Sequence, residues 1–278
     1  MKLIGVDLGG TNVRAGLVQS GRILNLESHK HADFGKNQII EEICRVIEKV
    51  LQPGIRGIGL GVPSAVDAKG TVYAVANIPS WRKVPLKEIL EKRFRLPVFI
   101  NNDAKCFALG ELHYGAGRGY KNLVGLIIGT GMGAGVIVEG KLFSGTNGAA
   151  GELGHMPYLE HEFEYYCSGR FFQREFGVDA FAAEQCADAG DAKAKKMFEA
   201  FGEHLGNAIQ AVLYAYDPEV IVLGGGVSKA FRHFEKAIHK NLKIFRFQAG
   251  LKKLVIAPSK HPHIAVLAAA ALCLDQQM

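Results

Sequence analysis

Apolar residues along the chain occur in short runs typical of buried strands and at spacings typical of amphipathic helices. The runs predict strands at residues 3–6, 55–62, 98–100, 123–128 and 220–223. The helical spacings predict helices over 39–51, 104–112 and 195–216, and a further helix from residue 229 onward. An apolar run at 264–274 is too short to span a bilayer and predicts a buried C-terminal helix. Because strands and helices alternate, the pattern predicts an α/β protein with mixed sheets.

Two stretches with the same pattern indicate an internal duplication. Residues 15–23 (AGLVQSGRI) and 134–142 (AGVIVEGKL) agree in pattern throughout, and each follows an apolar strand and a glycine-rich turn. Each half is therefore expected to begin as strand, glycine turn, strand, tight turn and strand. A chance repeat of glycine turns is the alternative, but the matching context of the two copies favours a duplicated protein with a cleft between its halves.

Composition and charge exclude several classes of protein. With 278 residues, 48% of them apolar and 22% charged, the chain is expected to be globular, and its length favours two domains. The formal net charge is +6, but Lys and Arg are interleaved with Asp and Glu, which favours a solvated surface over nucleic-acid binding. ATP, a polyanion, would suit a basic surface equally well.

The cysteines and the start of the chain bear on its compartment. Five widely spaced cysteines without a C-x-x-C motif predict reduced thiols in a cytoplasmic protein. The chain begins with Met1-Lys2 and enters an apolar strand without the features of a signal peptide. We therefore expect neither secretion nor association with a membrane.

The first glycine turn has the composition of a phosphate site. A carboxylate, Asp7, ends a predicted strand, and the residues that follow offer backbone N–H groups and a hydroxyl, namely Gly9, Gly10, Thr11 and Asn12. Consecutive amides of a tight turn can hold phosphate oxygens, and Asp7 could hold Mg²⁺ directly or through water. A turn cap is the commonest structural role of such an aspartate, and this turn alone leaves both roles open.

Two further glycine clusters extend the predicted nucleotide site. Residues 129–135 are richer in glycine than a hairpin requires, and phosphate contacts from the opposite domain are expected from Gly129, Thr130, Gly131 and Gly133. Gly225 and Gly226 lie between a predicted strand and a predicted helix, where a bare backbone could pass close to adenine. No P-loop is present, and no Rossmann G-x-G-x-x-G fits.

In the order and spacing of its motifs the chain resembles the ROK family, whose name joins repressors, open reading frames and kinases. The matching segments cover nearly the whole chain: Asp7–Asn12, Gly61-Val62-Pro63 with Val66-Asp67, Asn77-Ile78-Pro79-Ser80-Trp81, Asn102-Asp103-Ala104, Gly129–Gly135, Gly151-Glu152-Leu153-Gly154-His155, and Asp217-Pro218 through Gly226. The resemblance implies a duplicated actin-like ATPase fold of the ribonuclease H-like type, with two α/β domains flanking a cleft. The smaller domain is expected to comprise residues 1–103 and 262–278, and the larger one residues 104–261.

The resemblance also implies an ATP-dependent sugar kinase with Asp103 as general base. The sugar ligands that it implies besides Asp103 are Asn77, Asn102, Glu152, His155 and Glu164. Chemistry agrees, because phosphoryl transfer to an alcohol requires an acceptor for the hydroxyl proton, and a glutamate can bind adjacent sugar hydroxyls through its two oxygens. An N-cap of the helix over 104–112 is the structural alternative for Asp103, and both roles could hold.

The chain departs from the family in three places. Its kinases commonly carry a cysteine cluster after G-E-x-G-H that binds zinc together with that histidine, whereas residues 158–163 here contain no cysteine, so we predict no zinc. His155 must then be held by other contacts, and a histidine buried in the domain core is the alternative to a sugar ligand. Lys105 and Ser64 replace an asparagine and a glycine that are usual in the family, and Lys105 could face either phosphate or solvent.

The sequence therefore predicts a kinase that phosphorylates a hexose, expected at the 6-hydroxyl, with ATP and Mg²⁺. Glucose, allose, fructose, mannose and N-acetylated hexosamines remain candidate substrates, and polyphosphate remains an alternative donor. A non-catalytic sugar sensor or repressor is disfavoured because the first strand already includes Leu3, so no N-terminal helix-turn-helix is expected. An ATPase that binds no sugar is disfavoured by Glu152 and His155. The family suggests a homodimer.

Overall fold

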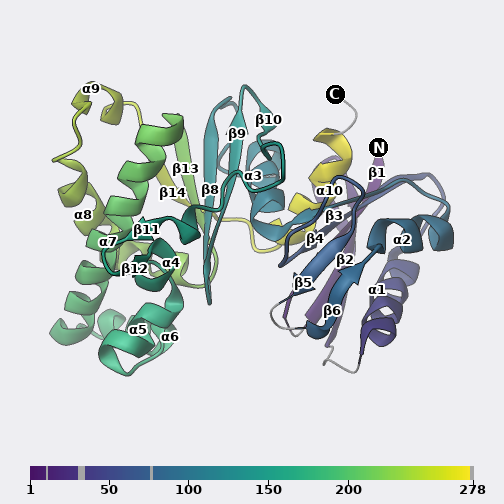
Figure 1. Cartoon of the computed structure of the whole chain (residues 1–278), viewed down its shortest axis with the longest axis horizontal. Helices are drawn as coiled ribbons and strands as arrows, with labels where there is room; N and C mark the ends of the chain where they lie inside the picture. The colour runs from purple at the N-terminus through teal and green to yellow at the C-terminus, as the bar shows by residue number, and fades with distance from the viewer. Residues whose placement is uncertain (11, 31–34, 76–77, 276–278) are drawn as a thin grey trace. The chain divides into compact units, whose positions relative to one another are not determined.

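The computed structural model of the chain describes residues 1–10, 12–30, 35–75 and 78–275. The chain divides into two compact units. The first unit comprises Met1–Gly119, Lys141–Ala150 and Lys260–Met278, and the second comprises Tyr120–Gly140 and Gly151–Ser259. The first unit is built around one five-stranded sheet, and the second unit contains four strands of another, whose fifth strand is formed by residues 141–142; both sheets contain parallel and antiparallel strands (Figure 1).

Five strands form the first sheet, in the order β3 (Arg22–Lys30), β2 (Asn12–Gln19), β1 (Lys2–Leu8), β4 (Ile55–Val62) and β7 (Val98–Asn102). β1 pairs antiparallel with β2 and parallel with β4, and β4 pairs parallel with β7. A separate hairpin consists of β5 (Val72–Val75) and β6 (Ile78–Val84). The helices of this unit are α1 (Lys36–Val50), α2 (Leu86–Phe94), α3 (Asp103–Tyr114) and α10 (Ile264–Asp275).

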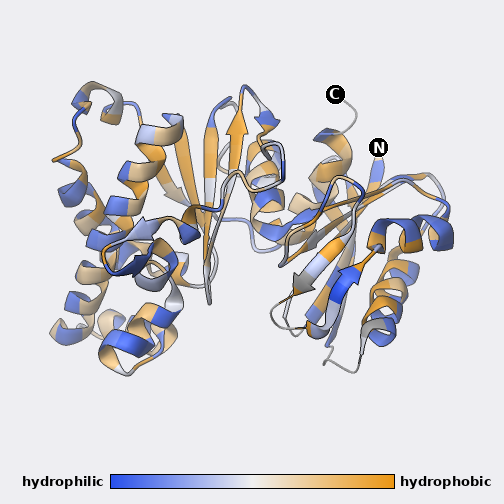
Figure 2. Ribbon diagram, viewed as in Figure 1, coloured by the Kyte–Doolittle hydropathy of each residue, from blue (hydrophilic) through white to orange (hydrophobic). Residues whose placement is uncertain are grey.

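The central strand β1 is buried on both faces because helices cover both sides of the sheet. Ile4 and Val6 belong to the same apolar cluster as Ile43 and Ile47 of α1. Leu3, one position away, packs instead with the apolar residues of α10. β1, β4 and α10 are correspondingly apolar along most of their length, whereas α1 also carries polar residues (Figure 2).

Helix α10 lies directly on the backbone of the first sheet. A Cβ atom added to Gly5 would lie 1.9 Å from the carbonyl oxygen of Val266, and one added to Gly59 would lie 1.8 Å from that of Ala269. Glycine is therefore required at both positions by the close approach of the helix, because any side chain would push α10 off the sheet.

Five strands form the second sheet, in the order β10 (Lys141–Leu142), β9 (Met132–Val138), β8 (Leu123–Ile128), β13 (Val220–Gly224) and β14 (Val255–Pro258). β8 pairs antiparallel with β9, whereas β13 pairs parallel with both β8 and β14. The strand order therefore repeats that of the first sheet, β10 taking the place of β3 and β14 that of β7. This repetition is the structural counterpart of the duplicated sequence pattern.

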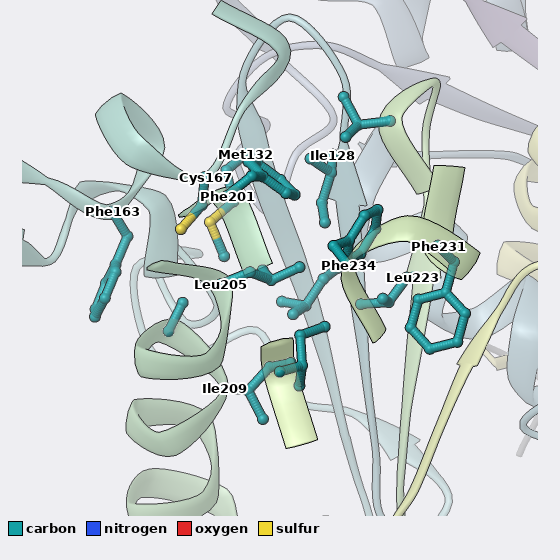
Figure 3. Close-up of a cluster of buried hydrophobic side chains, with 14 of the residues drawn as sticks. Ile128, Met132, Phe163, Cys167, Phe201, Leu205, Ile209, Leu223, Phe231 and Phe234 are labelled. Atoms are coloured by element: carbon teal, nitrogen blue, oxygen red, sulfur yellow. The ribbon is translucent and has the colours of Figure 1, made fainter. Parts of the chain in front are cut away.

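The second unit contains a larger set of helices. The longest is α7 (Ala192–Tyr216), and α8 (Phe231–Leu242) packs along it. The shorter elements are η1 (Leu153–His155), the hairpin strands β11 (Pro157–Tyr158) and β12 (His161–Glu162), α4 (Phe163–Tyr166), α5 (Gly169–Phe176), α6 (Ala180–Asp188), η2 (Val227–Ala230) and α9 (Gln248–Leu251). Phe201 and Leu205 of α7 share one apolar cluster with Phe234 of α8 and with Ile128 and Leu223 of the sheet (Figure 3).

The structure confirms the predicted α/β class and the duplicated fold. The strand predicted at 55–62 is β4, and the helices predicted over 39–51, 195–216 and 264–274 are α1, α7 and α10. The division into units differs from the boundary expected at residue 103, because α3 packs against α10 and lies in the first unit together with residues 141–150. Within the described residues no helix combines the length and the apolarity needed to cross a bilayer.

Replacing Gly59 by alanine is expected to destabilise the protein by about 3 kcal/mol or more, because the added methyl group would collide with the backbone of α10. Urea unfolding followed by circular dichroism measures this loss. The matched control is Gly226→Ala, since no atom lies within 4 Å of the added Cβ and Gly226 already has helical dihedral angles, φ −63° and ψ −42°. Equal unfolding midpoints for the two variants would contradict the close packing of α10.

Candidate active site

Asp7, the predicted Mg²⁺ ligand, and Asp103, the predicted base, both lie at the carboxyl ends of the parallel strands of the first unit. Asp7, near the end of β1, is in register with Gly61 of β4, and Gly61 is in register with Asn101 of β7. Asp103 follows directly as the first residue of α3. In open α/β sheets this edge is where ligands bind.

The charges of both aspartates reach the same buried thiol, that of Cys106. Burial raises the pKa of the Cys106 thiol well above its usual range, and the negative charges of Asp103 and Asp7 raise it further. Both carboxylates therefore act on one buried thiol. Two negative charges at one strand edge are suited to a cation or to an acceptor of protons.

Asn102, not Asp103, is the N-cap of α3. The Asn102 side-chain oxygen accepts hydrogen bonds from the backbone N–H groups of Ala104, at 3.0 Å, and Lys105, at 3.4 Å. Asp103 is the first helical residue, half-buried, and its Oδ1 also accepts from the Ala104 N–H, at 2.8 Å. The alternative of Asp103 as the N-cap is therefore wrong, and its carboxylate lies at the positive end of the helix dipole.

Asp7 is paired with a residue that the sequence analysis did not single out. The Arg14 guanidinium donates to Asp7 Oδ2 through Nη2 and, at 3.1 Å, through Nε. The two residues face each other in the register of β1 and β2. Because Arg14 binds Oδ2, a Mg²⁺ ion would be coordinated by Oδ1 or through water, and a carboxylate oxygen is the hard ligand that this ion requires. Asp7 thus fits the predicted role.

The two unusual residues of this unit are both buried. Lys105 is 3% exposed, and its ammonium group donates to the carbonyl oxygen of Gly148. The suggestion that Lys105 faces solvent is therefore wrong. Ser64 donates through its hydroxyl to the carbonyl oxygen of Tyr73 at 3.1 Å.

The second unit contains a cavity of about 630 Å³ where two of the predicted glycine clusters meet. Gly129, Thr130 and Gly226 line it. A Cβ added to Gly129 or Gly226 would have no atom within 4 Å, so the bare backbone at both positions faces open space that a side chain would fill. These observations fit a nucleotide, whose flat base and phosphates need close backbone approach.

Most other residues lining the cavity were missed by sequence reasoning. They come from α5, α6 and η2, and the polar or aromatic ones are Arg170, Gln173, Asp179, Phe181, Glu184 and Lys229. The one local signal is Asp179, which caps α6 by accepting from the N–H groups of Phe181 and Ala182, each at 2.9 Å. Arg170 and Lys229 supply the positive charge that phosphates require.

Not every predicted phosphate glycine faces the cavity. Gly225 has φ +84°, and a Cβ there would lie 2.3 Å from the carbonyl oxygen of Ile128, so this residue is needed for the turn itself. Gly133 lies in β9, paired with Ile127, and Gly131 lies against Glu164. These three glycines, which were predicted to contact the nucleotide, do not line the cavity.

The predicted sugar ligands of the second unit lie together. The Glu164 carboxylate accepts a hydrogen bond from the Met132 N–H at 2.9 Å, and His155 Nδ1 lies 3.1 Å from Glu162 Oε2. The hydrogen bond to Glu162 raises the pKa of His155, and the charges of Glu162, Glu164 and Glu152 raise it further. The His155 side chain is 64% exposed, so the alternative of a buried core histidine is wrong.

Two predicted site residues, Thr11 and Asn77, lie outside the described residues. Among the described ones, no group of three or more His, Cys, Asp or Glu side chains could hold a metal ion. Burial raises the pKa of the Cys167 thiol, which disfavours the thiolate that zinc would bind. The absence of zinc stays a prediction.

The paired five-stranded sheets and the glycine-lined cavity define a protein of the duplicated actin-like ATPase class. Residues 3–276 match the ROK family, and the chain belongs to that family.

Three relatives are similar to this chain in sequence or in structure. A glucokinase of Thermotoga maritima is 32% identical over 265 residues, which cover 83% of each chain. An N-acetylgalactosamine kinase of Shewanella sp. (strain ANA-3) is 33% identical over 253 residues, covering 81% of this chain and 82% of the relative. The crystal structure of a ROK family glucokinase from Streptomyces griseus in complex with glucose and AMPPNP superposes with a TM-score of 0.82, at 27% identity and with 100% of both chains covered.

We expect His155 to titrate above its ordinary pKa of about 6.5, as measured by NMR. The folded pKa is raised, so the ion pair with Glu162 is complete below the unfolded pKa and is lost as the pH rises through the folded value. Glu162→Gln should lower the pKa of His155 but leave that of His204, which burial lowers, unchanged. A His155 that does not titrate would instead indicate a bound metal ion.

Proposed function

We propose that this ROK family sugar kinase transfers the γ-phosphoryl group of ATP to a hexose hydroxyl, with Asp103 as the general base. The observation that carries the proposal is the position of Asp103 beside Asp7, at the carboxyl edge of the parallel strands. An aspartate there can accept the proton of an alcohol while the neighbouring carboxylate binds a cation.

Asp103 would take the hydroxyl proton as the oxygen attacks phosphorus. The N-terminal end of α3 favours its ionised form, which is the form that can act as a base. Asn102, fixed by its capping contacts, would hold the sugar beside it through the amide nitrogen. Mg²⁺ near Asp7, when bound, would offset the negative charge of the nucleotide phosphates.

Glu152, His155 and Glu164 would bind the remaining sugar hydroxyls. Each glutamate can accept hydrogen bonds from two adjacent hydroxyls, and a protonated His155 would donate one. We place the transfer at the 6-hydroxyl. The relatives include a glucokinase and an N-acetylgalactosamine kinase, so both plain and N-acetylated hexoses belong in the substrate test.

The cavity of the second unit would bind the nucleoside part of ATP. The Phe181 side chain is 67% exposed and lines this cavity, so its ring can cover a purine base. Polyphosphate has no base that could use an apolar wall, so the lining favours ATP as the donor. The relative from Streptomyces griseus, crystallised with AMPPNP, supports this assignment.

We also infer that the protein works in the cytoplasm, where ATP is available. All five cysteines, which lie within the described residues, are free, and four of them are buried. Such thiols suit a reducing compartment. A homodimer remains an expectation from the family.

Asp103→Asn should lower kcat by a factor of about 10² to 10⁴, because the amide cannot accept the proton. A coupled ADP-release assay over a panel of hexoses measures the loss, and calorimetry should show unchanged ATP binding. The control is Glu48→Gln, which removes an exposed carboxylate that pairs only with Arg93 among the ion pairs of the described residues. Full activity in Asp103→Asn would refute the assignment, and sugar binding without turnover by the unaltered protein would indicate a sensor.

Gly226→Ala should raise the KM for ATP roughly tenfold, because the added methyl group would occupy space in the cavity that ATP is proposed to fill. No protein atom lies within 4 Å of that methyl group, so the fold itself should be unaffected. The KM for sugar and the melting temperature should stay constant. Gly225→Ala is the contrasting variant, since its Cβ would meet the backbone of Ile128 and lower the melting temperature instead. An unchanged KM for ATP in Gly226→Ala would place the nucleotide elsewhere.

A further inference from the structure

Glu164 lies on an element that cannot fix its own position. Helix α4 consists of only four residues, Phe163–Tyr166. A single helical turn is not stable in isolation, because few hydrogen bonds offset the loss of backbone entropy. The orientation of the Glu164 carboxylate therefore depends on contacts outside α4, namely the Met132 N–H that donates to it at 2.9 Å and the side chains that pack around the turn.

Tyr158, from strand β11, contacts both ends of α4. Its ring stacks on Phe163 with 4.5 Å between centroids and an interplanar angle of 17°. It meets Tyr166 edge to face, at 5.4 Å and 90°. The two partners are the first and last residues of the turn that carries Glu164, so Tyr158 holds this turn from one side.

The hydroxyl of Tyr158 ties this arrangement to the longest helix of the unit. It lies 3.2 Å from His204 Nδ1, and the Asn207 amide donates to it at 3.1 Å. Burial lowers the pKa of His204, which favours the neutral imidazole. Because the Tyr158 hydroxyl already accepts from Asn207, its own proton is available to His204 Nδ1 in the tautomer that carries its hydrogen on Nε2, and both partners belong to α7.

A second stack fixes the other strand of the hairpin. The His161 ring lies 3.9 Å from that of Tyr165 at an angle of 18°, and the Arg174 guanidinium lies 3.9 Å above the Tyr165 ring. The Tyr165 ring of α4 therefore contacts both His161 of β12 and Arg174 of α5. The adjacent Glu162 of β12 is the residue that holds His155.

We propose that Tyr158 is a positioning residue for the sugar, acting through α4 and the β11–β12 hairpin on Glu164 and His155. This inference rests on the proposed function, because it assigns to Tyr158 the support of two proposed sugar ligands. In this role Tyr158 would act through its contacts with α4 and α7 and not on the sugar directly. Its anchorage on His204 and Asn207 transfers the rigidity of α7 to the carboxylate of Glu164.

Tyr158→Phe tests this proposal, because it keeps the stacked ring and removes only the hydroxyl. The KM for the preferred hexose should rise roughly fivefold, as expected for one lost hydrogen bond, while kcat at saturating sugar and the KM for ATP stay within about twofold. His204→Leu should reproduce the effect, and His204→Gln, which retains an acceptor, should restore part of the affinity. A variant that only lost stability would show a lower melting temperature without this selective change in KM.

The matched control is Tyr214→Phe, which removes the hydroxyl of a tyrosine in α7 that accepts a hydrogen bond from the Arg246 N–H at 3.4 Å. It should leave every kinetic constant unchanged. Hydrogen exchange of the Met132 amide, which donates to Glu164, gives a readout independent of turnover and should accelerate in Tyr158→Phe. Unchanged sugar KM or unchanged exchange at Met132 would overturn the positioning role, whereas an unaltered protein inactive on every hexose would overturn only the proposed function.

Discussion

The position of Asp103 depends on the close packing of α10 against the backbone of the first sheet. Gly59 lacks a side chain, so the carbonyl oxygen of Ala269 occupies the space where a Cβ would lie. Helix α3 is fixed against the same helix, since a Cβ on Gly110 would lie 2.5 Å from that of Ala268. Because α3 begins at Asp103, small residues along α10 determine where the proposed base lies. The stability of this unit and the position of the proposed base therefore depend on the same interface.

In the second unit, neighbouring glycines serve different physical purposes. Gly225 adopts a positive φ and lies against Ile128, so it is needed for the protein to fold. Gly226 is helical in conformation and opens onto the cavity, so its missing side chain leaves room for a ligand. A glycine-rich motif is thus part scaffold and part binding surface, and only the surroundings of each residue separate the two.

Two of the proposed sugar ligands, His155 and Glu164, lie on very short elements. His155 ends a 3₁₀ turn and Glu164 lies on a four-residue helix, and neither element could hold its conformation alone. Their geometry comes from the ion pair with Glu162 and from the aromatic stacks around Tyr158. The positions of His155 and Glu164 therefore depend on residues far away in the sequence, such as His204 and Asn207 of α7, which hold Tyr158.

The sequence by itself determined the α/β class, the duplication, and the main strands and helices, because periodicity and glycine turns are local signals. Asp7 was singled out by its glycine turn and Asp103 by the resemblance to the family, and the roles of both residues stay proposals. The tertiary structure alone decided that Arg14 pairs with Asp7, that Lys105 is buried, and that Phe181 lines the cavity. These facts depend on strand register and on packing between segments far apart in the sequence, and no local pattern encodes which distant residue will be the neighbour.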